Sequence, residues 1–277
     1  MAYDQSGYRI VENLLSDAEI SSTAEVKLNR LLRACHQAIL EGHTELASQA
    51  ARATVDTART WSPRKGSTVS FSLAREAVEF SSAGLFAEAA ELMLEAFRMQ
   101  DGDTYYRRRR RINRSVPPSK ETCGFEFFSH RRRSYEYMES PSLERMFQEI
   151  LGALRTNRQF LTGANLLRRR VEQVERFDDP DPAALGTERA QLAAFLLSAA
   201  GEIRDSNPAD SSAIRSLLFE SNCEFRQGVK EVGSFCGYDS DAYRELALGR
   251  RLALQESRFE FKDLDVLVSR HKDTGRE

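Results

Sequence analysis

The chain has 277 residues, enough for one large domain or two smaller ones, and 41% of them are hydrophobic, which suffices for a buried core. Charged residues make up 30% of the chain, and this balance excludes wholesale disorder. No apolar run reaches the roughly 18 residues that span a bilayer, and the N-terminal segment lacks the basic start and apolar core of a secretory signal. We therefore expect a cytoplasmic or nuclear protein with no membrane partner.

The first predicted helix follows Ser22 and Glu25, which have the spacing of a capping box. Gly42 can end this helix, and Thr44 can start a second one that runs towards Arg59. Apolar residues of the first helix recur at steps of three and four, which places them on one face. They are Leu28, Leu31, Leu32, Cys35 and Ile39.

Further helices are expected along the rest of the chain. After a loop near Trp61 and Pro63, the pattern predicts a second helical pair over 72–83 and 86–99. Later helices are predicted around 147–154, 160–174, 182–204, 209–230 and 240–257. The prolines at 180, 182 and 208 separate three of them. The sequence thus predicts a mainly α fold, either a helical bundle or irregular stacked helical hairpins, with an extended basic insertion.

The most regular apolar stripe lies in the predicted helix 160–174. Its members step by four, three, four and three residues, which is a heptad-like spacing. They are Phe160, Ala164, Leu167, Val171 and Val174. This stripe predicts contact with another helix, either of the same chain or of a partner.

Two segments share small residues at the same spacing. Gly42, Ala47 and Thr54 correspond to Gly84, Ala89 and Ala96. Over about residues 30–99, this arrangement resembles a tetratricopeptide-like helical repeat, although the offset exceeds the roughly 34 residues of that family. The resemblance implies a scaffold that binds peptides or proteins on a concave face, without catalysis. An ordinary helical bundle with Gly and Ala in its turns explains the same residues.

The predicted organisation has four parts. N-terminal hairpins cover 1–103, an arginine- and aromatic-rich arm covers 104–140, a C-terminal helical bundle covers 141–270, and a fraying tail covers 271–277. Only six of the 40 basic residues are lysines, so arginine dominates the positive charge.

The arm is the sharpest local feature. Residues 104–133 hold ten basic residues and two acidic ones, a net charge of +8, against −10 for the remainder of the chain. Arginines neutralise phosphates, and aromatic rings stack on unpaired bases. The residues expected to bind nucleic acid are Tyr105, Tyr106, Arg107, Arg108, Arg109, Arg110, Arg111, Arg114, Lys120, Phe128, Arg131, Arg132 and Arg133.

Three functions compete for this arm. It suits single-stranded nucleic acid, RNA in particular. It equally suits acidic protein surfaces, including those of a second copy, which would make the chain an assembly module or a structural component of a larger particle. A nuclear import signal or a solvated loop is the third interpretation.

No motif predicts an enzyme, a cofactor or a metal site. The chain has four histidines, and none is placed by a local motif beside a nucleophile and an acid. His36 follows Cys35, but adjacent helix residues point in different directions. There is no P-loop, and none of the four cysteines forms a CxxC pair.

Overall fold

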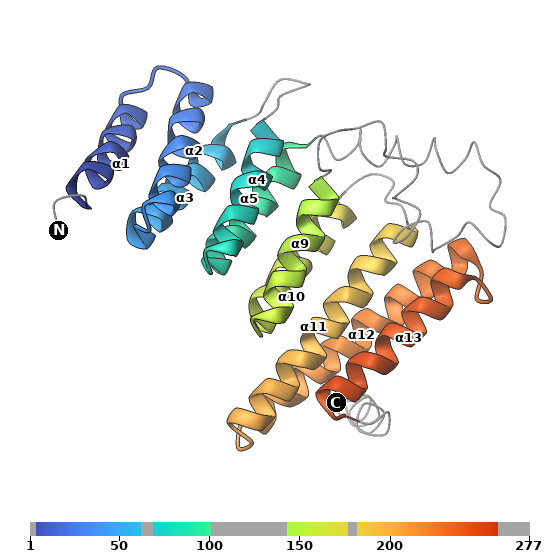
Figure 1. Cartoon of the computed structure of the whole chain (residues 1–277). Coiled ribbons are helices and arrows are strands. Elements are labelled where there is room, and N and C mark those ends of the chain that lie inside the picture. Colours follow the sequence, from blue (N-terminus) through green and yellow to red (C-terminus); the bar gives the residue numbers. More distant parts are fainter. Residues whose placement is uncertain (1–3, 62–68, 101–142, 177–181, 260–277) are drawn as a thin grey trace, which may run out of the picture. The chain divides into compact units, whose positions relative to one another are not determined.

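The computed structural model describes residues 4–61, 69–100, 143–176 and 182–259. Within these ranges the chain forms ten α-helices and no strand, which confirms the mainly α prediction (Figure 1). The described residues divide into two compact units. The first contains α1 to α5, α9 and the start of α10, and the second contains the rest of α10 with α11, α12 and α13. None of the helices in these ranges is both long and apolar enough to cross a membrane.

The first unit is built from antiparallel helix pairs (Figure 1). Its helices are α1 Asp4–Glu19, α2 Ala24–Leu40, α3 Thr44–Thr60, α4 Val69–Ser82, α5 Phe86–Met99 and α9 Leu143–Thr156. Helix α2 pairs with α3, and α4 pairs with α5; the two hairpins then stack through α2 on α4 and α3 on α5. Helix α1 covers α2, and α9 packs against α4 and α5. The core between them holds fully buried side chains such as Leu28, Leu73, Phe80, Leu92 and Met93.

Both hairpins close with the same turn. Gly42 and Gly84 have φ angles of 74° and 81°, a left-handed conformation that glycine adopts at little cost. The amide of Gly42 bonds the carbonyl of Ile39 at 3.0 Å, and the next amide reaches back five residues, which is the Schellman pattern. Gly84 and Leu85 repeat both bonds. The predicted end at Gly42 and the predicted start at Thr44 are confirmed.

A third turn of this type joins α9 to α10. Arg158 takes the left-handed position with φ 56°, and its amide bonds Arg155 while that of Gln159 bonds Leu154. Five residues after the left-handed position, the chain places Ala47, Ala89 and Gly163, all buried. The same turn therefore occurs a third time among the described residues, at a position where the sequence has arginine instead of glycine.

Three sequence predictions need correction. The N-cap of α2 is Thr23, whose hydroxyl accepts a bond from the Val26 amide at 3.3 Å, so Ser22 and Glu25 do not form the cap. The extended backbone of Thr23 (φ −133°, ψ 147°) sets this boundary. Helix α12 continues past residue 230 to Cys236, since its last turns bury Val232 and Gly233. Helix α1 has no counterpart among the predicted elements.

The second unit centres on two long helices. Its elements are α10 Phe160–Glu175 from Gly163 onwards, α11 Pro182–Ser206, α12 Ser211–Cys236 and α13 Asp241–Ser257. Helix α11 packs along α12, and α13 packs on both. At the crossing, a Cβ added to Gly186 would lie 2.7 Å from the carbonyl oxygen of Gly228, so the two backbones touch where side chains are absent. This contact explains glycine in the middle of two helices, where it costs about 1 kcal/mol relative to alanine.

The turn geometry predicts opposite effects for two glycine substitutions. Gly84→Ala should destabilise the first unit by about 1 kcal/mol, because an L-residue is strained in the left-handed region. Gly152→Ala is the control: Gly152 is exposed within α9 with nothing within 4 Å of its missing Cβ. It should stabilise the chain by about 0.5–1 kcal/mol through helix propensity. Thermal unfolding followed by circular dichroism measures both, and shifts of the same sign would contradict the assignment of the turn.

Candidate functional site

The predicted nucleic-acid-binding residues lie outside the described residues. All thirteen, from Tyr105 to Arg133, fall between Met99 at the end of α5 and Leu143 at the start of α9. The connection from α3 to α4 covers only residues 61–68, whereas the one from α5 to α9 covers 100–142. The basic segment thus lies between α5 and α9, two described helices of the first unit.

The heptad-like stripe lies on α10. Ala164, Leu167, Val171 and Val174 are buried within this single chain, at 4% exposure or less. Phe160, at the start of the helix, is only partly buried. Contact of Phe160 with a partner helix stays a prediction.

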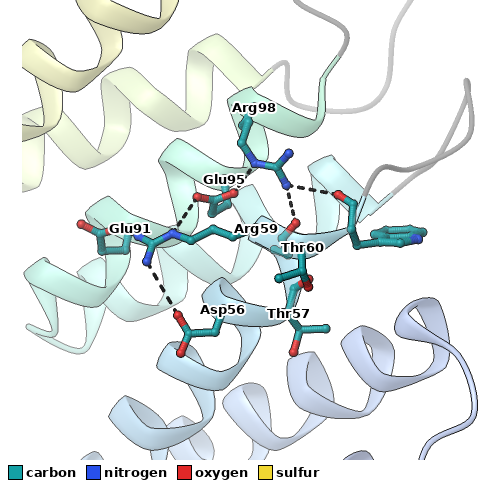
Figure 2. A network of polar contacts seen from close by, with 9 residues as sticks. Asp56, Thr57, Arg59, Thr60, Glu91, Glu95 and Arg98 are labelled. Carbon is teal, nitrogen blue, oxygen red and sulfur yellow. Dashed lines mark hydrogen bonds and ion pairs between the residues drawn. The ribbon is translucent and has the colours of Figure 1, made fainter.

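A polar network holds the C-terminal end of α3 against α5 (Figure 2). At its centre is Glu95 of α5, which is 4% exposed. Its two carboxylate oxygens accept bonds from two arginines, Nε of Arg59 at 3.3 Å and Nε of Arg98 at 2.5 Å. A carboxylate this buried is costly unless paired, and two guanidinium groups supply the pairing.

The two arginines extend the network in different directions. Arg98 Nη2 donates to the carbonyl oxygens of Ala58 and, at 3.3 Å, of Trp61, so it caps the end of α3 (Figure 2). Arg59 Nη2 donates to Glu91 at 2.7 Å. Carbonyls of the last helical turn have no intrahelical partner and lie at the negative end of the helix dipole, which favours a cation there.

Arginines from neighbouring helices also cap the C-terminal ends of two other helices, α1 and α13. Arg30 of α2 donates to the carbonyl of Asp17 in the last turn of α1. Arg204 of α11 donates to the carbonyls of Ser257 at 2.8 Å and Arg258 at 3.1 Å, at the end of α13. In each case an arginine from a neighbouring helix satisfies a helix C-terminus, so capping and helix pairing are coupled.

In the second unit, Arg189 of α11 joins three helices. Its guanidinium contacts Glu175 of α10 and, on α12, Glu224 at 2.5 Å and Glu231 at 3.3 Å. Arg168 of α10 adds a two-pronged bond to Glu220 of α12, at 2.7 and 3.0 Å. These geometries match the planar fork of arginine, which lysine cannot reproduce.

A different kind of cluster lies between α2 and α4. His36 Nδ1 lies 2.6 Å from Glu79 Oε2 and 3.8 Å from Glu76 Oε1. One ligand atom of each residue lies within 4.8 Å of the others, the spacing of a metal-binding group. Glu76 is 6% exposed, and burial, together with the nearby charge of Glu79, raises its pKa to about 7. Among the described residues this is the group whose donor set suits a cation.

Cys35 takes no part in a cysteine–histidine pair. Its thiol is fully buried and lies 3.6 Å from the Thr54 hydroxyl, while the neighbouring His36 turns to Glu79. Burial raises the pKa of the Cys35 thiol to about 12, so it stays protonated and is a poor nucleophile.

Comparison with known proteins gives no relative: no family model, curated protein or solved structure matches the chain. Sequence reasoning missed the capping arginines and the His36 cluster for one reason. His36 and Glu79 are 43 residues apart, and Arg98 and Ala58 are 40 apart. The spacing of Glu76 and Glu79 on one helix face was visible, but their histidine partner was not.

The Glu95 network predicts that Glu95→Gln lowers the free energy of unfolding more than Glu91→Gln does. Glu95→Gln removes the charge that two arginines share, and should destabilise the first unit by about 1–3 kcal/mol, the range for charged hydrogen bonds. Glu91→Gln is the matched control, because Glu91 contacts the same Arg59 but its side chain is 37% exposed. The control should lose less than about 1 kcal/mol. Urea unfolding measures the difference, and equal losses would show that Glu95 has no central role.

Proposed function

We propose that the chain is a non-catalytic scaffold of helical hairpins whose segment 104–133 binds single-stranded nucleic acid, RNA in particular. The observation that carries the proposal is local composition: ten basic residues, two acidic ones and several aromatic rings within thirty positions. Counterion release from phosphates supplies affinity without regard to sequence, and ring stacking supplies contact with unpaired bases.

The use of arginine in the helical body limits the proposal to the local cluster at 104–133. Arg59, Arg98 and Arg189 are each held by carboxylates or carbonyls of neighbouring helices. An arginine-rich composition alone is therefore no argument for nucleic acid, because the fold itself uses the guanidinium groups. Segment 104–133 differs in its local composition, because it holds ten basic residues and only two acidic ones.

The hairpins support the scaffold half of the proposal. Three turns of one type lie at Gly42, Gly84 and Arg158. Each of them joins two consecutive helices. Polar ties such as Glu95 with Arg59 then fix one hairpin against the next. Segment 104–133 lies between the end of α5 at Met99 and the start of α9 at Leu143, so packed helices of the first unit precede and follow it.

A second function, protein assembly, is favoured by a separate observation. Several large apolar side chains of the second unit are exposed near the end of α12 and along α13, among them Tyr238 at 58%, Leu248 at 55% and Leu252 at 48%. Leu248 and Leu252 are one helical turn apart, so they share a face. With a net charge of −10 outside 104–133, a second copy also offers an acidic surface to the basic segment.

A salt series tests RNA binding. The purified full chain should bind a single-stranded RNA at low salt, and the affinity should fall steeply as salt rises. Alanine at Arg107, Arg108, Arg109, Arg110 and Arg111 should reduce the slope of log affinity against log salt by up to about 3.5, because each phosphate contact on a single strand contributes about 0.7.

The control removes the same charge from the body. Alanine at five exposed arginines, Arg9, Arg33, Arg52, Arg215 and Arg251, should leave the slope nearly unchanged. No binding at low salt, or equal losses in both variants, would reject the RNA proposal. Light scattering on the same samples tests the alternative: a mass that falls with salt and with Leu248→Ser would indicate assembly through these surfaces.

A further inference from the structure

We propose that His36, Glu76 and Glu79 form a binding site for a divalent transition-metal ion, Zn²⁺ in the first instance, which fastens α2 to α4. The site lies in the helical body, and nothing in this proposal depends on the basic segment or on RNA.

The separations of the three ligand atoms are close to those of a metal site. The His36 nitrogen lies 2.6 and 3.8 Å from the two carboxylate oxygens, and all three ligand atoms lie within 4.8 Å of one another. Ligands about 2.0–2.2 Å from a tetrahedral Zn²⁺ are separated by roughly 3.3–3.6 Å. The distances from His36 Nδ1 to the two carboxylates, 2.6 and 3.8 Å, lie on either side of this range.

Glu76 supplies the independent observation. The residue is 6% exposed, and its Oε2 atom is buried without a hydrogen-bond partner. Its other oxygen faces the His36 ring at 3.8 Å, a long contact that repays little of the desolvation of a carboxylate. A bound cation would satisfy this carboxylate, and proteins retain buried charges mainly where they are paired or coordinate metals.

The donor set selects the class of ion. One imidazole nitrogen and two carboxylates suit Zn²⁺ and its neighbours in the transition series, whereas Ca²⁺ and Mg²⁺ prefer oxygen alone. Three protein ligands leave a fourth position for water, as in open zinc sites. The side chains of His36 and Glu79 are 38% and 29% exposed, which gives an ion access from solvent.

Two neighbouring groups bear on the affinity. Arg75 lies 3.6 Å from Glu79 and competes for its charge, but the Arg75 side chain is 71% exposed and can move away. The thiol of Cys35 faces Thr54, so it does not add a sulfur ligand. Protons compete for the same donors, so binding should weaken as the pH falls.

An ion at this site would join two helices that belong to different hairpins. Helices α2 and α4 belong to successive hairpins and pack on each other. An ion held by both helices binds the folded state alone, and so raises the free energy of unfolding as the concentration of free ion rises above the Kd. Zn²⁺ would therefore tighten the stacking of the first hairpin on the second.

The test is calorimetric titration of the chelator-treated full chain with Zn²⁺, alongside its melting temperature. We expect one Zn²⁺ to bind between α2 and α4 and to raise the melting temperature, while Mg²⁺ and Ca²⁺ do neither. His36→Gln and Glu79→Gln should each weaken this binding at least about tenfold, the effect that even outer-shell partners of metals have. His43→Gln, which alters the other histidine among the described residues, should leave it unchanged.

A crossed result separates a metal site from a purely structural cluster. Glu76→Gln removes a buried charge, so it should raise the melting temperature of the metal-free protein and abolish the rise caused by Zn²⁺. If Zn²⁺ does not bind, or binds equally well to the His36, Glu76 and Glu79 variants, the proposal is overturned. The three residues then form only a hydrogen-bonded contact between helices.

Discussion

The packing of this protein depends on guanidinium groups that reach from one helix to the C-terminal end of another. Arg30, Arg98 and Arg204 each donate to carbonyls in the last turn of a neighbouring helix or just beyond it. These carbonyls have no partner within their own helix and carry the negative end of its dipole. An arginine supplied by a neighbour therefore stabilises the helix end only when the two helices are packed, so local and tertiary structure form together.

The same groups account for the buried charges. Glu95 is tolerated inside the first unit because Arg59 and Arg98 both reach it, and Arg189 is tolerated inside the second because three glutamates surround it. Such networks gain little net free energy over apolar packing, since each ion loses its hydration. Their directional bonds do require one register of the helices. Arg59, Arg98 and Arg189 are thus structural residues of the helical body.

The sequence predicted what depends on neighbouring residues. Gly42 and Thr44 marked helix ends because glycine tolerates positive φ there, and the steps from Leu28 to Ile39 marked a face because a helix repeats every 3.6 residues. What it missed depends on distant residues or on strain. The third turn is hidden because Arg158, and not a glycine, takes the left-handed conformation there. The His36 cluster is hidden because it assembles only when the second hairpin stacks on the first.

The two hairpins of the first unit are joined by two polar contacts of different chemical character. Along α3 and α5 the contact consists of Arg59, Arg98 and Glu95, and arginine keeps its charge at every physiological pH. Along α2 and α4 it consists of His36, Glu76 and Glu79, and burial raises the pKa of Glu76 to about 7. The arginines of the first contact keep their charge over this range, whereas the charge of Glu76 in the second contact changes with pH. Since burial disfavours the charged carboxylate, ionisation of Glu76 as the pH rises towards 7 weakens the folded state at the α2–α4 contact.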